Sequence, residues 1–181
     1  MLKSSWKGEY DRVNMKKKTS WILPAVFALL VLVVMILIYY FSSENGLQST
    51  ATSNGVTKWV VKIIKPDFDS MEKADKAAYF SQVAHYVRKA AHFSEYFLLG
   101  LFSSLLVFSV LELFGKKSIL FFLIPIAFSF LYAVFDEYHQ RFVGGRAAQF
   151  TDVLIDTAGA TFATAIVALI FRLVKRHKND R

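Results

Sequence analysis

One uninterrupted apolar run near the start of the chain restricts what it can fold into. Residues 21–41 contain no Asp, Glu, Lys or Arg, and about 20 helical residues cross the roughly 30 Å hydrocarbon core of a bilayer. Three later runs are long enough to cross as well: Ala90–Phe114, Ser118–Phe135 and Phe150–Val174. The sequence therefore predicts an all-α, polytopic membrane protein with about four transmembrane helices in a bundle.

The first run is interpreted as a retained helix and not as a cleaved signal peptide. The apolar region of a signal peptide spans about 7–15 residues and ends in a small-residue cleavage site, whereas this run is longer and ends in Tyr39, Tyr40 and Phe41. Met15 stands directly before three lysines and is an alternative start to Met1.

Basic residues predict an orientation for these helices. The net charge is +8, and Lys and Arg cluster before residue 21, at Lys116 and Lys117, and after residue 171. Basic clusters beside membrane helices favour the cytoplasmic side, so both termini are expected there. Two outer connections follow: residues 42–89 and 136–149. The chain then divides into three parts: a basic cytoplasmic N-terminus (1–20), a membrane domain (21–174) and a basic cytoplasmic tail (175–181).

The longer outer connection contains an amphipathic segment. Its apolar and basic side chains fall on different helical faces: Val56, Trp59, Val60, Ile63 and Ile64 on one, and Lys58, Lys62 and Lys65 on another. Such a segment is expected to lie on the membrane surface or to cap the bundle. Pro66 ends it, and the lack of Gly and Pro from Met71 to Gly100 predicts one helix that continues into the second crossing.

Ionisable and amide side chains recur where the predicted helices meet the outer surface. Three groups occur at the outer ends of the second, third and fourth predicted helices: Arg88, His92 and Glu95; Asp136, Glu137 and Gln140; and Gln149, Asp152 and Asp156. Arg146 lies in the connection between the third and fourth helices. A charge near the bilayer centre costs about 2.5–3.5 kcal/mol, so charges at membrane depth are candidates for function. We predict that these residues form a ligand-binding site.

The acids in this set outnumber their obvious partners, which argues against pairing as their only role. Glu137 is placed to reach Arg141 at i+4. Gly144 and Gly145 predict a tight turn that lets Arg146 fold back toward Asp152 or Glu137. A salt-bridge network that only fixes the helices is the alternative interpretation.

Other chemistries have weaker support in the sequence. The chain has no cysteine, which excludes disulfides and thiolate sites. His92, Glu95, Asp152 and Asp156 are metal-ligand types, but His-x-x-Glu alone is a weak pattern, so we assign no metal and identify no cofactor. No serine-nucleophile elbow or nucleic-acid motif occurs. General acid–base catalysis by the carboxylates on a lipid-linked substrate is an alternative that the sequence leaves open.

Several short motifs surround the predicted site: Phe41-Ser42-Ser43 with Gly46 and Ser49, Arg88 to Tyr96 with Leu99-Gly100, Asp136 to Val143 with Gly145-Arg146, and Asp152 to Asp156 with Gly159-Ala160. Together they resemble the VanZ-like family of bacterial membrane proteins over about residues 21–174. Gly144 stands where that family often has proline. The founding member is associated with teicoplanin resistance, so the resemblance implies an envelope role without supplying a reaction.

We therefore expect a protein of the bacterial cytoplasmic membrane whose outward polar cluster binds a cell-envelope ligand. The ligand would be a lipid-linked wall or teichoic-acid precursor or the glycopeptide itself. Acids would recognise amines or a cation, and arginines would hold phosphate or carboxylate. A membrane enzyme acting on such a lipid is the first alternative, and a structural or partner-binding bundle with no ligand is the second. No nucleic-acid partner is expected.

Overall fold

The computed structural model describes residues 21–114, 120–146 and 148–179, which form helices joined by short connections. In chain order the elements are α2 (Ile22–Ser42), α3 (Gly46–Ile64), the 3-10 helix η1 (Phe68–Ser70), α4 (Lys73–Leu113), α5 (Leu120–Gln140) and α6 (Phe150–Asn179). The helices α2, α4, α5 and α6 are each long and apolar enough to cross a membrane. The prediction of a multi-pass, all-α membrane protein is therefore confirmed.

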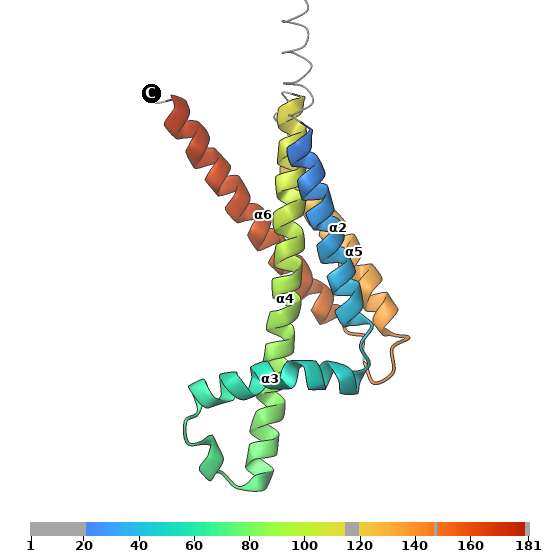
Figure 1. Cartoon of the computed structure of the whole chain (residues 1–181), viewed down its shortest axis with the longest axis vertical. Helices are drawn as coiled ribbons and strands as arrows, with labels where there is room; N and C mark the ends of the chain where they lie inside the picture. Colours follow the sequence, from blue (N-terminus) through green and yellow to red (C-terminus); the bar gives the residue numbers. More distant parts are fainter. Residues whose placement is uncertain (1–20, 115–119, 147, 180–181) are drawn as a thin grey trace, which may run out of the picture.

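The four long helices pack as a bundle that is tight at one end and open at the other. α2 and α5 lie beside α4, while α6 crosses α4 and diverges from it toward the C-terminus (Figure 1). α3 lies across the bundle near the end where α2 and α5 finish and α6 begins (Figure 1). Large apolar side chains such as Leu29, Ile36 and Leu131 are exposed on the outer faces, as expected where helices face lipid.

Small residues allow α4 and α6 to approach closely. A Cβ atom added to Gly100 would lie 2.5 Å from the backbone of Ala160, and Gly159 faces the backbone of Phe93 in the same way. The Ser104 hydroxyl donates to the Thr164 hydroxyl at 2.9 Å. Small residues and interhelical hydroxyl bonds of this kind are typical of helix packing in membranes.

The amphipathic connection is confirmed as helix α3. Asn45 and Gln48 form a capping box at its start, and the helix ends before Pro66. Thr57 and Val61 are buried, whereas Trp59 is 66% exposed. Because α3 packs on α4 and leaves this apolar face uncovered, the face is free to contact the membrane surface.

Two predicted boundaries change in the structure, and one is as predicted. α4 runs through the second crossing as one helix, as predicted. α5 continues to Gln140, because no Gly or Pro interrupts residues 126–143, and the predicted connection 136–149 shortens accordingly. α6 likewise continues through Asn179, into the predicted tail 175–181. The predicted N-terminal part (1–20) and Lys116 and Lys117 lie outside the described residues.

Candidate functional site

Two loops meet where α2 and α5 end. The Gly46 N–H donates to the Gly144 carbonyl at 3.1 Å, and a Cβ atom on Gly46 would lie 2.5 Å from the Gly145 oxygen. Gly145 has a φ of 77°, which glycine adopts at little cost. We call this part of the molecule the polar end; it comprises residues 41–53, 85–96, 136–146 and 148–156.

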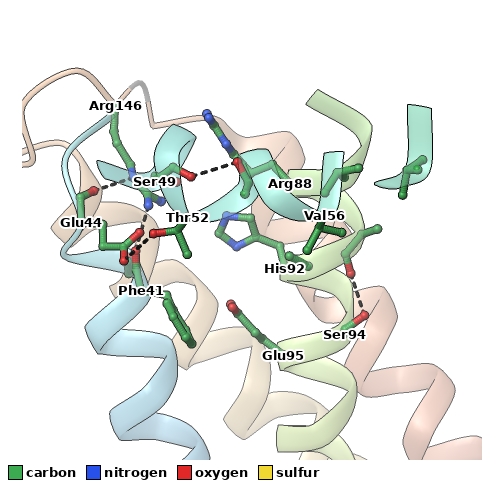
Figure 2. Close-up of a pocket in the computed structure, with 16 residues that line it drawn as sticks. Phe41, Glu44, Ser49, Thr52, Val56, Arg88, His92, Ser94, Glu95 and Arg146 are labelled. Atoms are coloured by element: carbon green, nitrogen blue, oxygen red, sulfur yellow. Dashed lines mark hydrogen bonds between the residues drawn. The ribbon is translucent and has the colours of Figure 1, made fainter. Parts of the chain in front are cut away.

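Arg146 joins the same two loops by capping α2. Its Nη2 donates to the Phe41 carbonyl at 2.8 Å and its Nε to the Glu44 carbonyl at 3.0 Å (Figure 2). The last carbonyls of a helix lack intrahelical donors, so the guanidinium stabilises the end of α2. Burial and then the nearby Arg88 lower the pKa of Arg146 from its usual value. The contact predicted with Asp152 or Glu137 is not formed among the described residues.

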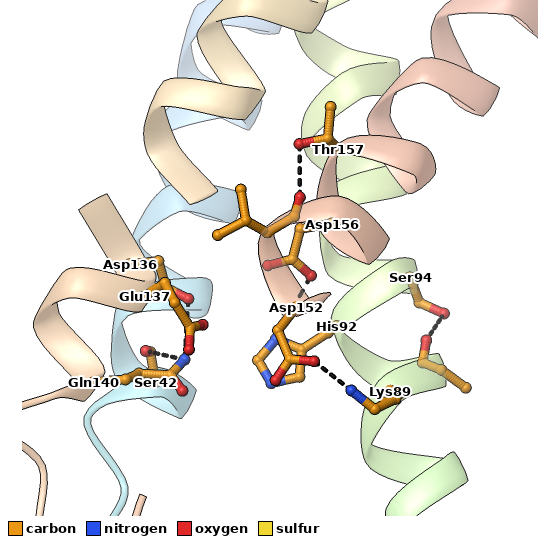
Figure 3. Close-up of polar contacts among 12 residues, drawn as sticks. Ser42, Lys89, His92, Ser94, Asp136, Glu137, Gln140, Asp152, Asp156 and Thr157 are labelled. Atoms are coloured by element: carbon orange, nitrogen blue, oxygen red, sulfur yellow. Dashed lines mark hydrogen bonds and ion pairs between the residues drawn. The ribbon is translucent and has the colours of Figure 1, made fainter. Parts of the chain in front are cut away.

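Both of those carboxylates have other partners. Asp152 forms an ion pair with Lys89 of α4 (Figure 3). Glu137 accepts from the backbone N–H of Gln149 just before α6, and the predicted partner Arg141 is exposed. Lys89 was missed by sequence reasoning, although it lies beside Arg88 at the same depth, because helix spacing alone does not identify a partner on another helix.

Gln140 connects α5 to α2. Its Nε2 donates to Ser42 Oγ at 2.8 Å and to Asp136 Oδ2 at 3.2 Å (Figure 3). All three side chains are buried. One helical turn before Asp136 on α5, the Tyr132 hydroxyl donates to the Met35 carbonyl of α2 at 2.7 Å. The polar face predicted for α5 is therefore turned toward α2, and it holds Asp136 in a defined position.

His92, Asp136 and Asp156 converge from three helices. Each side chain offers one nitrogen or oxygen atom that could bind a metal ion, and these three atoms lie within 4.8 Å of one another. Asp156 Oδ1 and His92 Nδ1 are 3.8 Å apart (Figure 3), which is too far for a hydrogen bond. Neither atom has a hydrogen-bond partner in the described part of the chain. This trio differs from the ligand set considered from sequence, because Asp136 replaces Glu95 and Asp152.

A cavity of about 420 Å³ opens between α3 and α4 beside these groups (Figure 2). Apolar side chains such as Val56, Val60 and Val87 form much of its wall, and Arg88 and Arg146 also line it. Arg88 Nη2 lies 3.4 Å from Thr50 Oγ1, and its buried Nε has no partner among the described residues. A second cavity of about 200 Å³ shares Arg88 and Arg146 and is lined mainly by polar side chains.

All the predicted site residues lie at the polar end. Those that line the two cavities are Arg88, His92, Glu95, Gln140, Arg146, Gln149 and Asp152; Asp136 and Asp156 belong to the trio, and Glu137 binds the start of α6. The hydroxyl residues Ser49, Thr52 and Ser53 of α3 also line the larger cavity. Sequence reasoning missed this role of α3, and their i, i+3, i+4 spacing was the available signal.

Comparison with known proteins assigns the chain to a family. Searches of curated proteins and of solved structures gave no match. The VanZ/LLP1 family model matches residues 27–172. This range includes every predicted site residue and nearly all of the described helices. The chain therefore belongs to the VanZ/LLP1 family of membrane proteins.

Proposed function

We propose that the polar end binds an anionic amphiphile of the bacterial cell envelope, either a lipid-linked wall or teichoic-acid precursor or a glycopeptide such as teicoplanin. One observation carries the proposal. Arg88 and Arg146 line the same apolar-walled cavity, and neither forms an ion pair with a carboxylate among the described residues. Two cations beside an apolar chamber suit an anionic head group with an attached hydrocarbon chain.

The chemistry of the cavity supports this class of ligand. A guanidinium recognises phosphate and carboxylate through paired hydrogen bonds. A volume of about 420 Å³ lies within the range of about 300–1,000 Å³ that small-molecule sites occupy. The buried Nε of Arg88 lacks a partner in the described structure, and an unsatisfied buried donor costs about 1–3 kcal/mol. A ligand oxygen at this position would recover that cost.

Acidic side chains at the same cavity favour a ligand that also carries an amine. Glu44 and Glu95 both line the cavity. Glu44 Oε1 already accepts from the Thr52 hydroxyl at 3.1 Å, whereas no hydrogen bond or ion pair to another described residue engages the Glu95 side chain. Glu95 is therefore the group that would face an ammonium in the ligand.

We place the polar end outside the cytoplasm, with both termini inside. The basic clusters support this orientation, because α6 carries Arg172, Lys175 and Arg176 at the opposite end of the bundle (Figure 1). The chain has no cysteine, so single cysteines report cleanly. An impermeant thiol reagent should label Gly144→Cys in intact cells and Lys117→Cys only after permeabilisation. The reverse pattern would show the opposite orientation.

The binding proposal is tested by measuring affinity with purified protein in detergent. The two probes are a polyprenyl phosphate and teicoplanin, tested separately to distinguish the two ligand sources. Arg88→Ala should weaken binding of the recognised probe at least about tenfold, because a charged hydrogen bond contributes about 1.5–3 kcal/mol. Arg141→Ala is the matched control, since Arg141 is an exposed arginine, and it should bind as the wild type does.

Two results would contradict the proposal: wild-type protein that binds neither probe, and an Arg88→Ala variant with unchanged affinity for both. Mass spectrometry of the recovered probe separates binding from chemistry in the same experiment. An unchanged probe mass supports a binding protein, whereas a time-dependent change in mass would support the enzyme alternative.

A further inference from the structure

We infer that His92, Asp136 and Asp156 form a binding site for one divalent transition-metal cation of the Zn²⁺ or Mn²⁺ class. The inference does not depend on the envelope ligand, because it uses His92, Asp136 and Asp156 and not the two arginines, although His92 also lines both cavities. It is carried by the geometry of the trio, by the balance of charge around it and by the side chains that hold Asp136.

The spacing of the trio suits a shared ion better than direct contact. The candidate ligand atoms lie within 4.8 Å of one another, and the Asp156 Oδ1 to His92 Nδ1 distance is 3.8 Å. This distance exceeds a hydrogen bond. It is shorter than twice a metal–ligand bond of about 2.1 Å, so an ion can contact both atoms at once.

The unpartnered state of Asp156 is the second, independent observation. Its side chain is only 2% exposed, and its Oδ1 has no hydrogen-bond partner among the described residues. The atom points toward His92 between α4 and α6 (Figure 3). A buried carboxylate is costly unless it is hydrogen-bonded, paired or bound to a metal. A cation between Asp156 and His92 satisfies both orphaned atoms.

Charge balance indicates a divalent ion. None of the nearby Lys and Arg side chains pairs with Asp136 or Asp156 among the described residues: Lys89 pairs with Asp152, Arg146 binds backbone carbonyls and Arg88 donates to the Thr50 hydroxyl. A protonated His92 would neutralise only one of the two carboxylates. A divalent cation held by two carboxylates and a neutral imidazole forms a complex with no net charge, which lowers the cost of burial.

The surroundings of the trio resemble the outer support of a metal site. Gln140 donates to Asp136 Oδ2 at 3.2 Å and is itself fixed by Ser42 at 2.8 Å. Hydrogen bonds that orient a ligating carboxylate are typical of metal sites. Three protein ligands leave a coordination position open for water or another ligand. One nitrogen and two oxygen ligands favour Zn²⁺ or Mn²⁺ over thiolate-preferring ions.

The test measures metal binding directly, with no envelope ligand present. Wild-type protein in detergent is stripped with a chelator, equilibrated separately with Zn²⁺ and Mn²⁺, desalted and analysed by elemental mass spectrometry. We expect about one ion per chain for at least one of the two metals. Asp156→Asn and His92→Ala should lower its affinity more than Gln140→Leu, for which a loss of about 10–100-fold is typical of a supporting residue.

A control variant and a separate test of folding distinguish a lost metal site from a lost fold. Glu112→Gln neutralises an acid near the C-terminal end of α4, the helix that carries His92, and it should bind metal as the wild type does. Retained fold of each variant is checked by gel filtration and thermal unfolding in chelator. Wild-type protein that takes up neither ion would overturn the inference, as would equal affinity in Asp156→Asn and Glu112→Gln. Either failure leaves the Arg88 affinity test unaffected.

Discussion

The polar end and the opposite end of the bundle are held together by different forces. We call the opposite end, comprising residues 108–114, 121–122 and 165–176, the aromatic end. There Phe108 stacks on Phe171 with ring centroids 3.3 Å apart, and Phe121 meets Phe108 edge-on at 5.8 Å. At the polar end hydrogen bonds and the Lys89–Asp152 pair connect the helices, and Arg88, His92 and Asp156 keep buried polar atoms without partners in the described structure.

This difference separates the contacts that hold the helices together from buried polar groups that have no such role. Aromatic contacts connect α4, α5 and α6 at the aromatic end, and the described residues there form no side-chain hydrogen bond between helices. At the polar end, by contrast, the unpartnered atoms of Arg88, His92 and Asp156 form no hydrogen bond that would join one described helix to another. Unpartnered buried groups cost stability, so their concentration at one end indicates a site that is completed by a ligand.

The largest expected effect comes from the close α4–α6 contact that lies between the two ends. Gly100→Val places side-chain atoms against the Ala160 backbone, where even a Cβ would lie at 2.5 Å. We expect a loss of at least about 3 kcal/mol, the upper part of the overpacking range, because a helix backbone cannot move aside alone. Thermal unfolding in detergent measures it.

Gly55→Ala is the control for that substitution. An added Cβ at Gly55 meets nothing within 4 Å, and replacing glycine inside a helix should stabilise α3 by about 0.5–1 kcal/mol. If Gly100→Val unfolds at the wild-type temperature, the close α4–α6 packing that links the two ends is wrong.

A smaller effect is expected from the ion pair at the polar end. The side chains of Lys89 and Asp152 are 23% and 20% exposed, so their coupling should lie between surface and buried pairs, about 1–3 kcal/mol. A double-mutant cycle with Lys89→Met and Asp152→Asn measures this coupling. The exposed pair Lys65–Asp67, with atoms 3.7 Å apart, provides the comparison and should give less than about 1 kcal/mol. Equal coupling energies for the two pairs would show that the polar end does not strengthen its ion pair.

The smallest effect is expected at the aromatic end. Phe171→Leu removes the stacking on Phe108 and should cost about 0.5–1.5 kcal/mol beyond the lost area. Affinity for the polyprenyl phosphate and for metal should stay at the wild-type value, because Phe171 lines neither of the two cavities that contain Arg88. A tenfold change in either affinity would show that the two ends are not independent.

Local sequence patterns predicted the helices well and the contacts between them poorly. The uninterrupted apolar run before Ser42 and the lack of breakers from Met71 to Gly100 were sufficient to predict α2 and the continuous α4. Spacing also placed His92 and Asp156 on polar faces. It could not show that Asp152 pairs with Lys89, since this depends on how Gly100 and Ala160 set the crossing of α4 and α6. Nor could it show that Arg146 binds backbone carbonyls, since this depends on two loops that meet at Gly46 and Gly144.

The central claim is that an anionic amphiphile occupies the cavity at the polar end and not the aromatic end. The aromatic end offers an alternative binding cavity of about 510 Å³, which lies among Phe108, Phe171 and their neighbours. Crosslinking with a photoreactive polyprenyl phosphate, followed by peptide mass spectrometry, compares the two directly. The account predicts crosslinks at Val56, Val60 and Val87 that excess unlabelled probe and Arg88→Ala remove. Crosslinks concentrated around Phe108 and Phe171, or spread evenly over the lipid-facing helices, would contradict it.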